Sequence, residues 1–130
     1  MGLSVEDHIA IQQLYARYNH AIDFGHADDW AATFTDSGVF NSGQGTFTGT
    51  DQLKGFVAGF AAQLKARHWT NNLVLAGDGQ TATGSCYLLL WRLQTGQPTN
   101  LLISGLYNDT LAKTAAGWRF TNRAVTPDAA

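Results

Sequence analysis

The chain of 130 residues has few of the features that mark disulfide-rich, nucleic-acid-binding, membrane or secreted proteins. A single cysteine, Cys86, excludes an internal disulfide framework and favours a reducing compartment. Only 14% of the residues are charged, the net charge is −2, and the basic residues are scattered, which argues against nucleic-acid binding. No apolar run approaches the ~20 residues of a membrane-spanning helix, and the N-terminus lacks the apolar stretch of a signal peptide. We therefore expect a soluble, cytoplasmic protein with no nucleic-acid or membrane partner.

The residues that are present are typical of one globular domain. Hydrophobic residues make up 45% of the chain, and seven Phe, four Tyr and four Trp are among them. A domain of this size buries roughly two-thirds of the surface of its unfolded chain, so a single core can form without disulfides or metals. We predict one domain over residues 1–130.

The first half of the chain predicts three helices. Residues 4–23 carry apolar side chains at helical spacing, and Ser4 with Asp7 resembles a capping box. Gly25 ends this helix, and a second, short one then leads to Phe34, with Asp28 or Asp29 as its cap.

A turn at residues 35–38, a short strand at 39–40 and a glycine-rich hairpin or loop at 41–50 follow the second helix. Thr50 or Asp51 is expected to cap the third helix, which presents Leu53 and Val57 to the core.

The second half predicts four strands joined by short turns: HWTNNLVLAG, TATGSCYLLLWRLQTG, TNLLISGLYNDTLAK and GWRFTNRAV. Short connections indicate an antiparallel meander, so the fold class is α+β, a curved antiparallel sheet packed on three N-terminal helices. The stretch CYLLLWRL is almost continuously apolar, although a sheet with one solvated face should alternate. A second subunit is the simplest cover for the other face, and we predict a homodimer or homotrimer.

Two titratable residues are the main candidates for chemistry. Strand alternation places His68, Thr70 and Asn72 on one face. If that face looks into a cavity, His68 can move a proton, and a carboxylate such as Asp23 would fix its tautomer and raise its basicity. The pattern leaves alternatives open. Asp23 is rotated by roughly 140° from Tyr18 and lies on the flank of the apolar stripe, and His68 is equally compatible with an ordinary structural role.

Other side chains are candidates for a pocket. No spacing of histidine, cysteine and acidic residues indicates a metal site, and we expect no cofactor. The aromatic residues exceed what a small core needs, and they either line an apolar pocket or fill a core or subunit interface. The predicted substrate-pocket residues are Trp30, Phe34, Phe40, Phe56, Phe60, Asn72, Cys86 and Trp91, although a lone buried thiol is more often a small hydrophobic group.

Segments across nearly the whole chain resemble the SnoaL-like family of the nuclear transport factor 2-like superfamily. They are IQQLYARYNHAIDFGHADDWAATFTDSGVF, GTDQLKGFV, RHWTNNLVLAGDGQTA, SGLYNDTL and GWRFTNR. The resemblance implies a cone-shaped fold, in which a strongly curved antiparallel sheet wraps three helices and leaves a deep apolar pocket at its wide end.

The resemblance also implies roles for particular residues. In scytalone dehydratase, bile-acid dehydratase and hexachlorocyclohexane dehydrochlorinase, an acid late in the first helix pairs with a strand histidine that removes a proton. The matching positions are Asp23 and His68. Tyr18 matches a tyrosine proposed to polarise substrate oxygen, and Arg123 matches a cation near the leaving group. Trp91 departs from the pattern, because the dehydratases carry a histidine or aspartate near that position.

The resemblance therefore implies an enzyme without a cofactor. It would remove a proton from carbon of a small apolar substrate (polyketide, steroid-like, aromatic or alicyclic), giving elimination, isomerisation or cyclisation. The alternative is a non-catalytic domain of the same fold that binds a small molecule or serves in assembly. Epoxide hydrolysis is a weaker option, because it usually needs more than one central carboxylate.

Overall fold

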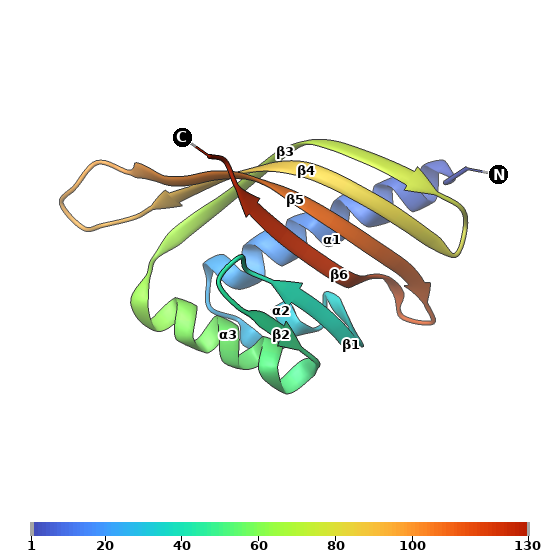
Figure 1. Ribbon diagram of the computed structural model, residues 1–130, viewed down its shortest axis with the longest axis horizontal. Helices are drawn as coiled ribbons and strands as arrows, with labels where there is room; N and C mark the ends of the chain where they lie inside the picture. Colours follow the sequence, from blue (N-terminus) through green and yellow to red (C-terminus); the bar gives the residue numbers. More distant parts are fainter. Residues whose placement is uncertain (1, 130) are drawn as a thin grey trace.

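A computed structural model describes residues 2–129, which form three helices on one side of a six-stranded curved sheet (Figure 1). The strand order is β2-β1-β6-β5-β4-β3, so β3 and β2 are the edges. In chain order the elements are α1 (Val5–Asp23), α2 (Ala27–Ala31), β1 (Phe34–Asn41), β2 (Thr46–Thr48), α3 (Thr50–Gln63), β3 (Ala66–Gly77), β4 (Thr81–Arg92), β5 (Asn100–Thr114) and β6 (Gly117–Pro127).

Helix α1 begins and ends as the sequence predicts. The Ser4 hydroxyl accepts a hydrogen bond from the Asp7 backbone N–H at 3.0 Å, and the Asp7 carboxylate accepts one from the Ser4 N–H at 3.3 Å. This capping box satisfies two backbone donors that a helix N-terminus otherwise leaves free. Gly25, at φ +71°, then turns the chain away from the helix axis.

The predicted caps of the other two helices are wrong. Helix α2 begins after His26, which makes no side-chain cap, so Asp28 and Asp29 lie within its first turn instead. Acidic side chains there still interact favourably with the positive end of the helix dipole. Helix α3 follows Gly49, whose φ of +83° favours glycine at this bend.

Strand β1 is longer than predicted. The segment 35–38, expected to be a turn, belongs to β1, which pairs in parallel with β6 from Phe34↔Phe120 to Asn41↔Ala124. A register shift between Phe34 and Val39 accommodates the extra residues, as in a β-bulge. Strand β2 pairs with β1 as the predicted hairpin.

Strands β3 to β6 form the predicted antiparallel meander, and the α+β architecture with a curved sheet is confirmed. Each strand of the meander buries alternate side chains against the helices. The alternation in β3 is interrupted between Asn71 and Val74, where the register shifts and Asn72 adopts φ +56°. The bulge leaves Asn72 exposed, and it is therefore not a neighbour of His68 in a pocket.

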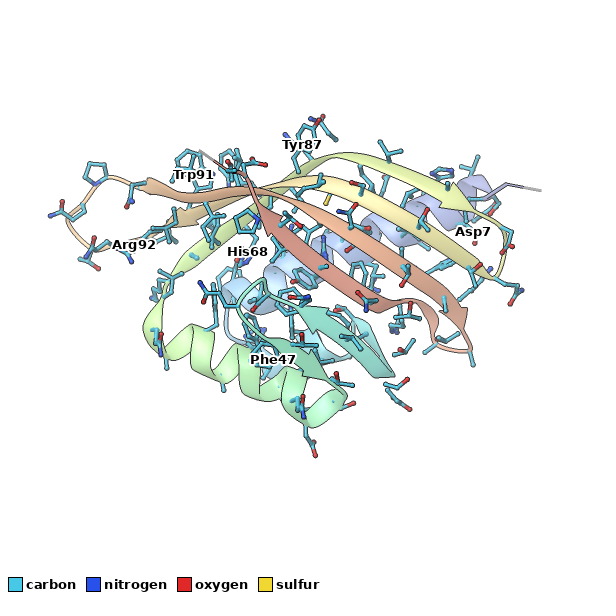
Figure 2. The ribbon with its side chains drawn as sticks, in the orientation of Figure 1. Asp7, Phe47, His68, Tyr87, Trp91 and Arg92 are labelled. Carbon is cyan, nitrogen blue, oxygen red and sulfur yellow. The ribbon has the colours of Figure 1, made fainter. Side chains whose placement is uncertain are left out.

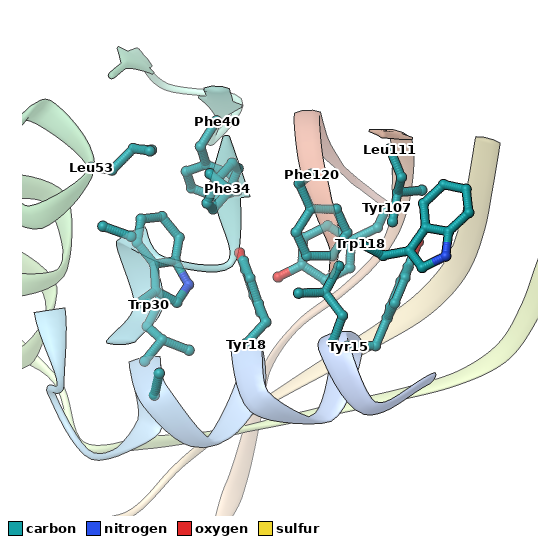
Figure 3. Packing of buried hydrophobic residues seen from close by; sticks show 14 of the residues in the cluster. Tyr15, Tyr18, Trp30, Phe34, Phe40, Leu53, Tyr107, Leu111, Trp118 and Phe120 are labelled. Carbon is teal, nitrogen blue, oxygen red and sulfur yellow. The ribbon is translucent and has the colours of Figure 1, made fainter. Parts of the chain in front are cut away.

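The core lies between α1, the inner face of the sheet and α2 (Figure 3). Aromatic rings dominate it: Tyr18 lies 5.3 Å from Trp30, and Trp30 lies 5.4 Å from Phe40, between ring centroids. The largest fully buried side chains include Trp30, Arg123, Tyr18, Tyr107 and Phe120. One of these is a charged guanidinium, whose surroundings are described below.

Candidate active site

The last turn of α1 delivers Asp23 to the edge strand β3. An edge strand has backbone N–H groups with no partner strand, and these need other acceptors. The Asp23 carboxylate accepts the His68 N–H with both oxygens, at 3.1 and 3.2 Å. A hydrogen bond of 3.0 Å from Asn19 to Thr70 ties α1 to β3 one turn earlier. Asp23, which the helical pattern placed on a flank, therefore lies against the strand that carries His68.

The same carboxylate also contacts the imidazole of His68. The distance between His68 Nδ1 and Asp23 Oδ1 is 2.6 Å, and the two side chains are only 5% and 6% exposed. An ionised carboxylate only accepts hydrogen bonds, so Nδ1 carries the hydrogen, and in a neutral imidazole Nε2 then keeps its lone pair. The arrangement fixes the tautomer that a general base requires.

His68 faces the helices, whereas Tyr87 and Trp91 stand on the opposite face of the sheet (Figure 2). The His68 ring packs against Phe60 of α3, with 5.6 Å between ring centroids. Asp23 and His68 also line a groove of about 490 Å³, which we call the dyad groove. Ligand sites commonly have volumes of roughly 300–1,000 Å³. Its other walls come from Phe24, Arg67, Trp69 and Asn71, among others.

Tyr18 and Arg123 lie together, but within residues 2–129 they make no hydrogen bond, ion pair or ring contact with Asp23 or His68. The guanidinium carbon of Arg123 lies 4.2 Å from the centre of the Tyr18 ring, and both side chains are fully buried. Burial raises the pKa of the Tyr18 hydroxyl well above its usual value. In the described part of the chain, Arg123 Nη1 has no hydrogen-bond partner, and the Tyr18 hydroxyl has only the Tyr107 side chain as a polar neighbour that influences its pKa through hydrogen bonding.

Arg123 is neutralised by a carboxylate that sequence reasoning missed. Asp109 of β5 lies 3.1 Å from Arg123 Nε, and both side chains are 0% exposed. Burial raises the pKa of the Asp109 carboxyl, although Arg123 and the Tyr15 hydroxyl oppose the shift. Tyr15 donates to Asp109 at 2.5 Å, and four aromatic rings surround the guanidinium, the nearest being Tyr107 at 3.5 Å. The alternation of Tyr107, Asp109 and Leu111 along β5 is the signal that would have revealed an inward acid.

The aromatic residues predicted to line a pocket pack mostly as core. Trp30, Phe34 and Phe40 are buried within the hydrophobic cluster, and Phe56 and Phe60 pack partly buried against it. The composition left open a pocket, a core or a subunit interface, and these residues belong to the core or pack against it.

Cys86 and Trp91, also predicted as pocket residues, lie apart from His68. Cys86 is buried beside Arg123, whose Nη2 donates to its Sγ at 3.6 Å, and burial raises the pKa of the thiol to about 11. Trp91 pairs with Arg67, and its ring lies 5.7 Å from that of Trp69 at a tilt of 55°. It lies on the other face of the sheet from His68, because it follows Leu90, the cross-strand partner of His68.

Residues 2–129 contain no group of three or more His, Cys, Asp or Glu side chains that could hold a metal ion. None of the helices in this part of the chain is long and apolar enough to cross a membrane.

Known protein structures share this fold, and a family model identifies the family of the chain. The SnoaL-like domain family matches residues 3–124, and the chain therefore belongs to the SnoaL-like family. A protein of unknown function from Mycobacterium tuberculosis is 30% identical, with a TM-score of 0.89 over 94% of this chain and 72% of its own. A comparison with curated proteins finds no match.

More distant structures share the fold. A proposed scytalone dehydratase from Novosphingobium aromaticivorans is 21% identical, with a TM-score of 0.84 over 96% of this chain and 86% of its own. ActVI-ORFA from Streptomyces coelicolor is 22% identical, with a TM-score of 0.84 over 93% of this chain and 97% of its own. At these identities the likeness shows a common nuclear transport factor 2-like, or cystatin-like, fold.

Proposed function

We propose that the protein is an enzyme that removes a proton from a carbon atom of a small apolar substrate, with His68 as the base. The observation that carries the proposal is the 2.6 Å contact between His68 Nδ1 and Asp23 Oδ1, which leaves Nε2 free to accept a proton. Asp23 is a positioning residue, because it acts through His68. The carbanion that forms then expels a leaving group, is reprotonated elsewhere or attacks a carbonyl, which correspond to elimination, isomerisation and cyclisation.

The environment of His68 suits this step. Phe60 supplies apolar surface beside the imidazole, Leu90 is the cross-strand partner of His68, and the dyad groove can hold a small organic molecule. The fold shared with a proposed scytalone dehydratase is consistent with elimination. Proton transfer from carbon to a histidine base requires no cofactor.

Tyr18 and Arg123, which lie in the core, have a proposed role in stabilising charge on the substrate. Within residues 2–129, Arg123 Nη1 is a buried polar atom without a hydrogen-bond partner, and such atoms usually have one. In the proposal the two side chains stabilise charge on a substrate oxygen or leaving group that reaches them. This role requires the rings of Trp30 and Phe34, which pack against Tyr18, to move apart when substrate enters.

The test is hydrogen exchange from solvent. Wild-type protein is incubated in D2O with a panel of small cyclic ketones and aromatic polyketide-like phenols, and deuterium uptake at carbon is followed by mass spectrometry. We expect His68→Ala to lower the exchange rate about 10²–10⁴-fold, the usual contribution of a general base. Asp23→Asn should lower the rate with little change in KM, whereas a merely structural role would alter both through loss of folded protein. Full exchange by His68→Ala would overturn the proposal.

A non-catalytic ligand-binding domain is the second candidate. The observation that favours it is the sealed environment of Tyr18 and Arg123, which make no hydrogen bond, ion pair or ring contact with Asp23 or His68 in the described structure. In that case a ligand of the panel binds and is recovered without deuterium, and His68→Ala binds it with unchanged affinity.

We further propose that a second or third copy of the chain covers the outer face of the sheet. Trp69, Tyr87 and Leu101 on this face are 60%, 54% and 46% exposed, and Trp91 lies among them. Contiguous apolar surface of this kind typically marks an interface. Light scattering coupled to size-exclusion chromatography should give a dimer or trimer for the wild type and a monomer for Tyr87→Lys. A wild-type monomer at high concentration would contradict this proposal.

A further inference from the structure

A second groove, on the other side of the last turns of α1, gathers positive charge. It has a volume of about 380 Å³ and lies between α1, α2 and the start of β6. We call it the basic groove; the residues that matter for its chemistry are Arg17, His20, Phe24, His26, Asp29 and Arg119. His20 and Phe24 also border the dyad groove, so the two grooves share the last turn of α1 as a wall.

The turn between β5 and β6 holds the Arg119 guanidinium in place. Its Nη1 donates to the Trp118 carbonyl at 2.7 Å, and its Nη2 donates to the Ala116 carbonyl at 3.0 Å. A guanidinium has five N–H donors in a rigid plane, so about three remain for another partner. A cation that is already oriented loses less entropy when it binds an anion.

The two arginines of the basic groove have no carboxylate partner. Within residues 2–129, neither Arg17 nor Arg119 lies within ion-pair distance of an acid, whereas Lys54 pairs with Asp28 at 3.2 Å. Partial burial, and after it the positive charge of Arg17, lowers the pKa of Arg119. Both guanidiniums line the same groove, so their positive charges repel each other, and an anion bound between them would relieve the repulsion.

The remaining side chains fit the neighbourhood of an anion. Asp29, the one acid on the groove wall, is 79% exposed and lies 3.9 Å from His26. Phe24 is 58% exposed and stands between His20 and His26, with 6.3 Å from its ring to each imidazole. The Arg67 guanidinium lies over this ring, 5.0 Å from its centre, and the exposed part of the ring offers apolar contact to the body of a ligand whose charged group reaches the arginines.

We propose that the basic groove binds a small organic molecule through a phosphate or carboxylate group, with Arg119 and Arg17 on the anion and Phe24 against the organic part. Arginine forms paired, charge-assisted hydrogen bonds with both kinds of oxyanion. The site is distinct from the Asp23–His68 pair and does not depend on its chemistry. It gives the protein a second ligand position on the far side of α1.

Calorimetric titration at low ionic strength tests the proposal, with phenyl phosphate, inorganic phosphate and benzoate as probes. We expect one-to-one binding of phenyl phosphate or benzoate, and the stronger of the two identifies the preferred oxyanion. Phenyl phosphate should bind more tightly than inorganic phosphate, and Phe24→Ala should remove that difference. Arg17→Gln and Arg119→Gln should each weaken binding about tenfold, the loss of about 1.4 kcal/mol.

The control is Arg92→Gln, which removes the same charge from an exposed residue at the end of β4, outside the groove. It should change the affinity less than about twofold, because surface charges at a distance are screened. Arg119→Gln can also loosen the turn that Arg119 supports, so Arg17→Gln on the helix surface is decisive. No saturable binding of any probe, an unchanged affinity of Arg17→Gln, or equal weakening by Arg92→Gln would each overturn the proposal.

Discussion

The molecule buries two pairs of an acid and a base, and their surroundings differ. The Asp23–His68 pair joins a helix end to an edge strand and borders a groove. The Asp109–Arg123 pair is fully enclosed, and the ring of Tyr15 is one of four aromatic rings around the guanidinium. A histidine can gain and lose a proton near neutrality, whereas an arginine keeps its charge. The first pair therefore suits chemistry, and the second suits the structure of the core.

Breaking the enclosed pair should have the largest effect on stability. Asp109→Leu leaves the Arg123 charge buried without compensation, and such losses cost about 3–5 kcal/mol. The double variant Asp109→Leu with Arg123→Met should recover most of this free energy of unfolding in urea denaturation. If Asp109→Leu alone is as stable as the wild type, the pair does not organise the core.

Tyr15 provides the next test of the enclosed pair. Tyr15→Phe removes the hydroxyl that donates to Asp109 and leaves a buried carboxylate oxygen with one partner fewer. We expect a loss of about 1–3 kcal/mol in the free energy of unfolding. Thr83→Val, which removes an exposed hydroxyl of β4, is the control and should change stability by less than about 0.5 kcal/mol.

Breaking the Asp23–His68 pair should change the free energy of unfolding only a little. Asp23→Asn keeps an oxygen that can accept the His68 N–H, so we expect unfolding to change by about 1 kcal/mol. Its effect on deuterium exchange should be much larger. A loss of stability as great as that of Asp109→Leu, with no change in exchange rate per folded molecule, would contradict the division of roles between the pairs.

A third buried carboxylate, that of Asp7, allows the contribution of a buried acid to stability to be measured apart from both pairs. A hydrogen bond from the Trp118 indole, at 3.0 Å, is the main reason that the pKa of Asp7 falls to about 2. Because the folded state lowers this pKa, the stabilisation is complete above about pH 4 and is lost as the pH falls towards 2. The stability difference between wild type and Asp7→Asn, measured by thermal unfolding, should therefore shrink between pH 5 and pH 2. A difference independent of pH would contradict the assigned cause.

The fold could be predicted where local pattern and tertiary structure agree. The capping box of α1 and the turns of the meander are local signals, and both appear in the structure. The segment 35–38 has the composition of a turn, and it becomes strand only because β6, from the far end of the chain, pairs beside it. Asn72 was misplaced because strict alternation cannot anticipate a bulge.

The candidate site shows the same limit. The helical pattern alone placed Asp23 on a flank. Its place at the end of the first helix suggested it as a partner of His68, and the family resemblance matched both positions. Asp109 was overlooked because one acid in a strand carries no motif, and its partner lies on another strand. The basic groove was not foreseen either, since Arg17 and Arg119 are far apart in the sequence and are brought together only by the packing of α1 against the start of β6.

One consequence follows from the backbone hydrogen bonds that Asp23 accepts from residue 68. These bonds do not involve the imidazole, so they persist when the side chain of His68 is removed. His68→Gly would therefore retain a carboxylate in its original position, facing a space of the size of the missing ring. Free imidazole added to the solution should occupy that space, be oriented by Asp23 and restore part of the deuterium exchange. The backbone hydrogen bonds thus hold the Asp23 carboxylate in place independently of the imidazole that it contacts.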